Sequence, residues 1–301
     1  MTQKKKPTRT PTAKKQSAQM AKLLQEAVHM DHLPAKEAGT LAFMSRNMIL
    51  ATMPHSKPKE LYFERRNGKF RLAMLADPRY GLPYGSLARL LLAWVTTQAT
   101  VTRMPVVELE ESMSGFMKEL GITPTGGQTG SIKRFKDQML RLFTTSIACT
   151  YERNERWVDE RHTLAEMSQL WWNPEAPEAT RKFSKVCLTE SFFQELLAHP
   201  VPLDFRAIKA LQKSPLAMDI YCWLTYRYHT LANPTLIPWE GLMMQFGSNY
   251  TETRQFRRKF LQQLSKVLVV YNEAKIEEIR KGDVSKGMKL WPSPTHITPI
   301  H

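Results

Sequence analysis

The sequence predicts an α+β fold made of two units that repeat one order of elements. Each half of the chain holds a long apolar helix, a short helix that stops at a glycine, and a basic amphipathic helix. Residues suited to strands and turns then follow each basic helix. The two halves share this order of elements but not their residue identities. The prediction of a repeated unit therefore rests on the order of elements alone. A chance basic face would have no reason to recur at the same place in the same series.

The basic helix of the second half, residues 251–264 within the stretch 249–268, shows the clearest pattern. Thr251 or Thr253 can cap it, because a hydroxyl oxygen accepts a hydrogen bond from an unpaired backbone N–H of the first turn. Its apolar residues recur at helical spacing and include Phe256, Phe260, Leu264 and Val267. Its opposite face is polar and consists of Thr251, Arg254, Gln255, Arg258 and Gln262.

Cations and amides on one helix face suit recognition in a DNA major groove. Arginine and lysine bind phosphates or guanine, and glutamine pairs with adenine. We therefore predict that this face, together with Lys259, contacts DNA. The alternative is a solvated basic face on an ordinary surface helix. Arg257 lies within the apolar arc, and we expect it to reach out to a phosphate or to a nearby acid.

The elements around this helix complete a winged-helix pattern. Residues 238–247 read as a short helix that ends at a glycine, which gives the order of a helix-turn-helix. Residues 267–271 are a β-branched run that predicts a strand. Residues 274–280 and 287–291 flank a turn signal at 281–283 and predict a hairpin, the wing. Its basic side chains would be Arg280, Lys281, Lys286 and Lys289.

The first half contains the same series. Residues 86–99 predict an apolar core helix, and residues 112–121 predict a helix that Ser112 caps and a glycine ends. After a turn rich in glycine, residues 131–143 predict the second basic amphipathic helix, and residues 146–151 predict a strand. The polar residues of this helix that we expect to contact DNA are Lys133, Arg134, Gln138 and Arg141.

The first half also carries a hairpin, and the chain divides into three parts. Asn67 and Gly68 lie between two apolar-aromatic runs, which predicts a type I′ turn between strands. Prolines at 199–202 disfavour a continuing helix and predict the domain boundary. The three parts are a basic tail with a short amphipathic helix at 1–35, a first winged-helix domain at 36–199 and a second at 200–301.

The charge indicates a polyanionic partner. The 43 basic and 28 acidic residues give a net charge of +15, which favours nucleic acid or an anionic membrane. No apolar run is long enough to span a bilayer, and no signal peptide is recognisable. Residues 1–16 are basic and lack acidic residues, so we expect a disordered tail. Three widely spaced cysteines fit no disulfide or zinc pattern, which makes a cytoplasmic setting the expectation.

We expect no catalysis, no cofactor and no bound metal. The glycine cluster before the first basic helix lacks the Gly-Lys-Ser/Thr of a P-loop. A DNA-nicking enzyme would need closely spaced metal-binding histidines and a nucleophilic tyrosine. Tyr221, Tyr226 and Tyr228 could serve as nucleophiles, but no His-x-His pair accompanies them, so we interpret them as core residues.

Several segments together resemble the RepA-type plasmid replication initiators, an iteron-binding, tandem winged-helix family. These segments are residues 75–85 (LADPRYGLPYG), 89–95 (RLLLAWV), 116–121 (FMKELG), 125–127 (TGG), 146–150 (SIACT) and 215–224 (PLAMDIYCWL). The likeness spans about residues 60 to 295 and leaves the tail outside.

The resemblance implies a set of functional expectations. The chain would bind directly repeated sites, or iterons, in double-stranded DNA at a plasmid origin, open nearby DNA and recruit host initiator and helicase-loading proteins. The first domain could also form a homodimer, which puts Arg134 and Arg141 in doubt as base readers. Specificity would then rest on Arg254, Gln255 and Arg258 of the second domain. The alternatives are a transcriptional repressor without a replication role, a DNA-nicking enzyme and a membrane-surface scaffold.

Overall fold

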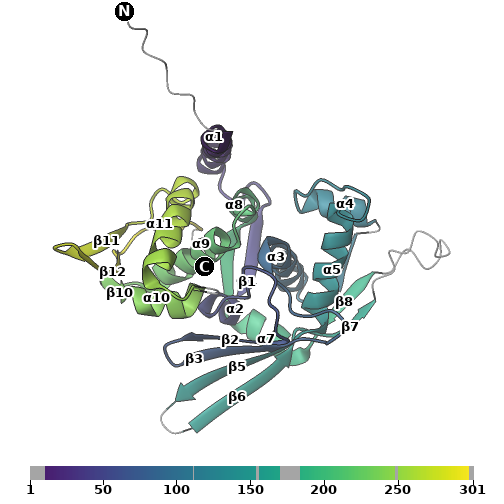
Figure 1. The fold of residues 1–301 in the computed structure, drawn as a ribbon. Helices are drawn as coiled ribbons and strands as arrows, with labels where there is room; N and C mark the ends of the chain where they lie inside the picture. Colours follow the sequence, from purple (N-terminus) through teal and green to yellow (C-terminus); the bar gives the residue numbers. More distant parts are fainter. Residues whose placement is uncertain (1–10, 111, 154–155, 170–183, 248–249, 298–301) are drawn as a thin grey trace, which may run out of the picture.

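Helices and small antiparallel sheets alternate along the chain, as the predicted α+β class requires (Figure 1). The structure is a computed structural model and describes residues 11–110, 112–153, 156–169, 184–247 and 250–297. The first helix, α1 (Pro11–His32), packs against elements of the second half and lies apart from the larger sheet (Figure 1).

Two short strands from opposite halves of the chain pair with each other. β1 (Leu41–Ser45) runs antiparallel to β9 (Pro200–Asp204). A short helix follows each strand, α2 (Arg46–Leu50) after the first and α8 (Phe205–Leu211) after the second. The predicted domain boundary therefore falls at a paired strand, and the pairing ties the beginnings of both halves together.

The first unit lies between β1 and β9 in the chain and has three helices and a small sheet of three strands. Its elements are α3 (Gly85–Thr102), β4 (Val106–Glu108), α4 (Met113–Glu119), α5 (Ser131–Thr144), β7 (Ala165–Gln169) and β8 (Lys185–Leu188). The strands are ordered β4-β8-β7, so the strand after the first helix pairs with the last strand. Ser112 caps α4 as predicted, because its side chain accepts a hydrogen bond from the Gly115 N–H at 3.0 Å.

The second unit repeats this series. Its elements are α9 (Pro215–Thr230), β10 (Thr235–Pro238), α10 (Trp239–Phe246), α11 (Thr253–Val270), β11 (Ile276–Lys281) and β12 (Val284–Leu290). Its strands are ordered β10-β12-β11, which is the same arrangement as in the first unit. The predicted repetition of one order of elements is thus present in the structure.

One insertion distinguishes the first unit from the second. β5 (Ser146–Arg153) and β6 (Arg156–Thr163) lie between α5 and β7 in the chain and extend the hairpin of β2 (Tyr62–Asn67) and β3 (Phe70–Leu75). The result is a four-stranded antiparallel sheet that lies below the helices in Figure 1. α7 (Glu190–Ala198), capped by Thr189, leads from the first unit into β9.

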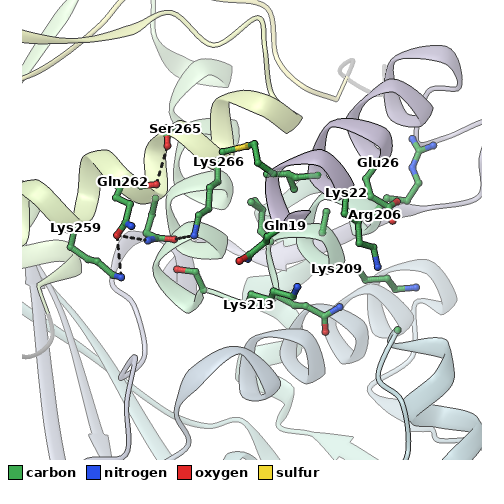
Figure 2. A pocket seen from close by; sticks show the side chains of 18 residues that line it. Gln19, Lys22, Glu26, Arg206, Lys209, Lys213, Lys259, Gln262, Ser265 and Lys266 are labelled. Carbon is green, nitrogen blue, oxygen red and sulfur yellow. Dashed lines mark hydrogen bonds between the residues drawn. The ribbon is translucent and has the colours of Figure 1, made fainter. Parts of the chain in front are cut away.

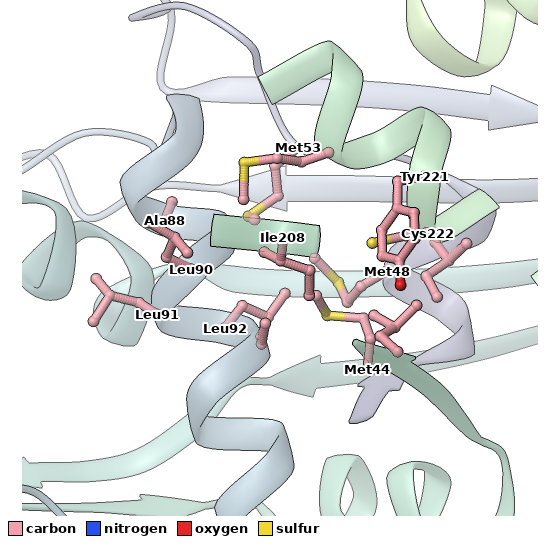
Figure 3. Packing of buried hydrophobic residues seen from close by; sticks show 14 of the residues in the cluster. Met44, Met48, Met53, Ala88, Leu90, Leu91, Leu92, Ile208, Tyr221 and Cys222 are labelled. Carbon is pink, nitrogen blue, oxygen red and sulfur yellow. The ribbon is translucent and has the colours of Figure 1, made fainter. Parts of the chain in front are cut away.

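The apolar helices α3 and α9 form the centre of one continuous core. Leu90 and Leu91 of α3 and Ile220 and Leu224 of α9 are fully buried, and residues of both units belong to the same hydrophobic cluster. Figure 3 shows methionines of β1, α2 and the following loop filling the space between α3, α8 and α9. Methionine is unbranched and flexible, so it suits irregular gaps between helices that come from different units.

A buried ion pair crosses this core and joins α3 to α9. The Arg89 guanidinium donates to both carboxylate oxygens of Asp219, at 2.6 and 2.7 Å. It also donates to the carbonyls of Met53, Pro54 and Gly85, so its donors are largely satisfied inside the protein. A bidentate arginine–carboxylate contact has a fixed geometry, and this one therefore sets how the two units sit against each other.

His55 completes the cluster around the carboxylate. Its Nε2 lies 2.7 Å from Asp219 Oδ2, and because a carboxylate only accepts, the ring N–H donates. Burial lowers the pKa of His55, which outweighs the opposing effect of Asp219. Burial alone would raise the pKa of Asp219, but the charge of Arg89 and the hydrogen bonds from His55 and Arg89 give a net lowering. The ion pair is therefore formed at neutral pH.

Two local predictions are wrong at the ends of α11. α11 begins at Thr253 with Glu252 at the N-cap position, and neither Thr251 nor Thr253 provides a capping hydrogen bond. The run at 267–271, predicted as a strand, continues α11 to Val270 instead. Val267 and Val270 are buried on the same face as Phe260, so tertiary packing outweighs the preference of valine for strands.

Two further predictions require adjustment. The hairpin of β2 and β3 exists, but Asn67 pairs with Phe70 as the last residue of β2, so Gly68 and Lys69 are the central turn residues. The turn is therefore shifted by one residue from the predicted Asn67–Gly68 position, and Gly68 adopts the required positive φ of +55°. Residues 11–16, which we expected to be disordered, form the first turns of α1, while residues 1–10 lie outside the described part.

We predict that Asp219→Asn lowers the free energy of unfolding by about 3 to 5 kcal/mol, because it leaves the Arg89 charge buried and poorly paired. Urea unfolding of the whole chain measures this change. Asp77→Asn is the matched control, since Asp77 pairs with exposed Arg79 in the loop after β3. Equal unfolding midpoints for the two variants would show that the buried pair does not join the units.

Candidate nucleic-acid interface

The buried face of α11 anchors this helix in the second unit. Phe256, Phe260, Leu264 and Val267 are all buried, as the helical spacing predicts. The rings of Phe256 and Phe260 pack edge-on against Trp239 of α10, with centroids 6.3 and 5.7 Å apart. The aromatic contacts fix the rotation of α11 about its axis and so decide which side chains face solvent.

The opposite face of α11 is exposed and rich in cations and amides. The predicted site residues Thr251, Arg254, Gln255, Arg258 and Lys259 are all exposed. Gln255 donates to Glu252 at 3.1 Å, and Lys259 donates to Gln262 at 3.3 Å, both within the helix or its cap. These local contacts are weak enough to exchange for contacts with a ligand, so the face is available for binding.

Arg257 connects α11 to the hairpin of β11 and β12. Its Nε lies 2.6 Å from Glu278 Oε1, which confirms the predicted contact with a nearby acid. Ser285 of β12 donates to the same carboxylate at 2.5 Å and accepts a hydrogen bond from the Trp239 indole N–H at 2.7 Å. A continuous polar chain therefore holds α11, the hairpin and α10 in one arrangement.

The hairpin presents additional cations next to α11. Its strands pair from Ile276–Leu290 to Lys281–Val284, so the predicted turn signal is correct. Lys281 is exposed at the end of the hairpin, where Gly282 supplies the required φ of +60°. Lys289 lies over the ring of Trp291, with Nζ 3.9 Å from the ring centroid, and is thereby held at the base of the hairpin.

The corresponding helix of the first unit offers a smaller exposed face. Lys133 and Arg134 of α5 are exposed, and so is Lys136, which the sequence analysis overlooked. Lys136 follows Lys133 at i+3, a spacing that places both residues on one face and could have revealed it. Figure 1 shows α5 and α11 on opposite sides of the central helices α3 and α9.

Gln138 and Arg141 do not fit the predicted role as DNA contacts. Both are buried, and both bind the loop that precedes α3. Gln138 accepts a hydrogen bond from the Tyr84 N–H at 2.9 Å. Arg141 pairs with Asp137 at 2.7 Å, donates to the Leu82 carbonyl at 3.4 Å and lies over the Tyr84 ring. The loop packs back onto α5, which the spacing of polar residues along the helix alone could not show.

The tyrosines considered as nucleophiles lie in or near the core. Tyr221 is buried, its hydroxyl accepts from the Asp204 N–H at 3.0 Å, and His296 Nδ1 lies 2.8 Å away. Burial raises the pKa of the Tyr221 phenol well above its ordinary value and that of Tyr228 to about 12. Tyr226 is half-buried. Deprotonation to a nucleophile is thus unfavourable at Tyr221 and Tyr228.

The described part of the chain contains neither a metal-binding cluster nor a membrane-spanning helix. Within it, no three histidine, cysteine or acidic side chains are grouped so that they could hold a metal ion. None of its helices combines the length and the apolar character needed to cross a membrane.

Comparison with known proteins places the chain in a family. A family model described as plasmid-encoded RepA protein matches residues 82–239, which is more than half of the chain. The chain belongs to this plasmid replication protein family. The matched region of this RepA-family chain extends from the loop before α3 to the start of α10, so α11 and the hairpin lie beyond it.

Solved structures show a similar fold over a longer range. Domains 2 and 3 of RctB, in selenomethionine form, have a TM-score of 0.51 and 11% identity, covering 81% of this chain and 95% of that chain. A second crystal structure of RctB domains 2–3 has a TM-score of 0.49 and 12% identity, covering 81% and 96%. At such low identity the first likeness concerns the fold alone. A comparison with curated proteins gives no match.

We predict that Arg141→Ala lowers the free energy of unfolding by about 1 to 3 kcal/mol, because it removes charged hydrogen bonds that tie the loop to α5. The ratio of affinities for specific and random DNA should stay the same. Arg134→Ala, a change at an exposed position of the same helix, should leave the unfolding midpoint unchanged. If Arg141→Ala kept full stability and lost DNA discrimination instead, Arg141 would belong to the interface.

We also predict that the Glu278 network weakens in acid. Burial alone would raise the pKa of Glu278, but Ser285 and the charges of Arg257 and Arg280 give a net lowering. The carboxylate therefore stabilises the fold above its unfolded pKa of about 4.5, and this contribution is lost as the pH falls through the lower folded pKa.

Glu278→Gln tests this linkage. The variant should be about 1 to 2 kcal/mol less stable than the wild type at pH 7 and pH 5. The difference should shrink as the pH falls below 4, and urea unfolding at several pH values follows it. A difference that is constant down to pH 3 would mean that the charge of Glu278 does not stabilise the network.

Proposed function

We propose that this chain is a plasmid replication initiator that binds directly repeated sites in double-stranded DNA at the plasmid origin. Membership of the plasmid RepA family supports a role in replication. The observation that carries the DNA-binding role is the exposed face of α11, where Arg254, Gln255 and Arg258 stand beside a cationic hairpin. This combination of donors suits base edges and phosphates in a major groove.

Each unit is proposed to be a winged helix. The order of three helices, with a strand after the first and a hairpin after the third, supports this assignment in both units. In the second unit α10 and α11 would be the helix-turn-helix, and β11 and β12 would be the wing that carries Lys281. α11 would enter the major groove, and the hairpin would contact the neighbouring backbone.

The exposed residues are proposed to make two kinds of contact with DNA, to base edges and to phosphates. Arg254, Gln255 and Arg258 would read base edges, while Thr251, Lys259 and Lys281 would bind phosphates and set the register. In the first unit, Lys133 and Arg134 would add phosphate contacts or face a second protomer in a homodimer. Because Arg89 and Asp219 hold the units together, one monomer would engage groove segments about one helical turn, or ~10 base pairs, apart.

Origin opening and recruitment of host initiator and helicase-loading proteins complete the proposal. The chain itself is proposed to act by binding and not by catalysis. The buried tyrosines support a role without DNA nicking, since Tyr221 and Tyr228 lie within the core. Incubation with supercoiled origin DNA and Mg²⁺ or Mn²⁺ should yield no relaxed product.

A gel shift at two salt concentrations tests the DNA-binding role. DNA that flanks the chain's own gene competes with a scrambled duplex of equal composition. A ladder of shifted bands that persists with competitor is expected, because repeated sites bind successive copies. Equal and salt-sensitive binding of both duplexes would refute specific recognition and leave only the effect of net charge. Plasmid maintenance with the protein supplied in trans then separates an initiator from a repressor.

We predict that Arg254→Ala and Arg258→Ala each lower the ratio of specific to random affinity by about 5- to 150-fold, the loss of one bidentate base contact. Binding titrations at constant salt measure both affinities. Lys57→Ala is the control, since it removes an exposed cation from the loop between α2 and β2. An unchanged ratio in both arginine variants would remove α11 as the specificity element.

A further inference from the structure

A large cavity lies beside α11, between this helix, α1 and α8 (Figure 2). Its volume is about 580 Å³. Its walls come from α1, from α8 and the residues that follow it, from the second half of α11, and from Gly121 after α4. The cavity is thus formed mainly by α1, α8 and α11, and the first unit contributes Gly121.

The cavity has a strong excess of positive charge. Five lysines line it, namely Lys22, Lys209, Lys213, Lys259 and Lys266. Arg206 also contributes, but its guanidinium is paired with Asp204 at 2.7 Å. Among the described residues that line the cavity, Glu26 of α1 is the only acid. An uncompensated group of ammonium ions in a recess attracts an anion.

The lysines are close enough to affect one another. Burial lowers the pKa of Lys266, and the charges of Lys259 and Lys213 lower it further. Burial also lowers the pKa of Lys209, against the opposing charge of nearby Glu119. Lys266 Nζ donates to Gln263 Oε1 at 2.9 Å, which orients the ammonium group along the wall. Each ammonium group has three donors, so donors remain for a bound oxyanion.

The position of the cavity relative to α11 identifies the anion. Gln255, Lys259, Gln262 and Lys266 are spaced at intervals of four, three and four residues, so they form one line along the helix. Arg254 and Arg258 lie on the neighbouring line, so the proposed base-reading face consists of these two arginines and of Gln255 at the start of the first line. Arg257 lies on the far side of that face and contacts the hairpin through Glu278. The hairpin and the cavity therefore flank the base-reading face on opposite sides.

We propose that this cavity binds a backbone phosphate of the DNA duplex, on the side of α11 away from the hairpin. The assignment rests on the proposed function, since it requires that α11 lie in a major groove. A helix in the major groove has a sugar-phosphate strand on each side, and the hairpin serves only one of them. Lys213 and Lys266 would hold the other strand at the junction of the two units, adding affinity and register without reading sequence.

Lys213→Gln/Lys266→Gln tests the proposal in the full-length chain. The affinity for the flanking duplex and for the scrambled duplex is measured across a series of salt concentrations. The slope of log affinity against log salt should become less steep by about 0.9 on both duplexes, the effect of losing one phosphate contact. The ratio of specific to random affinity should not change, because a phosphate carries no sequence information.

Lys57→Gln/Lys59→Gln is the matched control. It also removes two lysines, both exposed, from a loop that does not line the cavity. The control should keep the wild-type slope. Equal slopes for the wild type and the cavity variant would overturn the proposal, provided that both unfold at the same urea concentration. If the double variant fails to fold, Lys213→Gln alone decides, since Lys213 is exposed.

Failure of the cavity assignment and failure of the proposed function give different results. A wild type that does not distinguish the two duplexes contradicts the proposed function, whereas the cavity is judged by the difference in slope between variants. A free phosphate ion could bind to the same lysines in place of a DNA phosphate. If inorganic phosphate at constant ionic strength raises the unfolding temperature of the wild type but not of the cavity variant, and the slopes are equal, the cavity binds a free anion and the DNA assignment is wrong.

Discussion

The arrangement of the whole molecule depends on the ion pair between Arg89 and Asp219. Both side chains lie in helices that are largely buried, where an unpaired charge would be strongly unfavourable. The bidentate geometry admits one relative position of α3 and α9, and His55 and three backbone carbonyls restrict it further. An apolar contact of the same size would tolerate sliding. The charge pair thus contributes less to stability than to a defined spacing between the two units. This spacing also fixes the distance between α5 and α11.

The two units share a plan but differ in what their third helices can bind. In the first unit, Gln138 and Arg141 hold the loop that precedes α3, which leaves a small cationic patch around Lys133. In the second unit none of the described loops covers α11 in this way, and its polar face stays exposed along most of its length. The inserted strands β5 and β6 add a sheet to the first unit alone. The asymmetry favours specific recognition by the second unit and a supporting role for the first.

The sequence was sufficient where the determining interactions are local. Helical spacing predicted the buried face of α11, and Ser112 and the hairpin turn at 281–283 were found from short-range signals. Prediction failed where a distant segment decides the outcome. Asp219 lies 130 residues from Arg89, the partner of Gln138 is a backbone N–H 54 residues away, and Val270 is helical because the core covers it. The cavity could not be foreseen either, because its lysines come from three helices and a loop.

The two flanks of α11 are built in contrasting ways, and the contrast follows from electrostatics. On the hairpin side, the cation of Arg257 is neutralised by Glu278, which is itself held by Ser285, so this flank is rigid and already paired. On the cavity side, Lys213 and Lys259 lie close enough to Lys266 to lower its pKa, and the lining residues described include a single glutamate. Repulsion between these ammonium groups raises the electrostatic energy of the unbound protein, and a bound anion would lower it. A duplex would therefore meet a fixed support on one side of the groove and an unsatisfied positive recess on the other, which draws the backbone toward the junction of the two units.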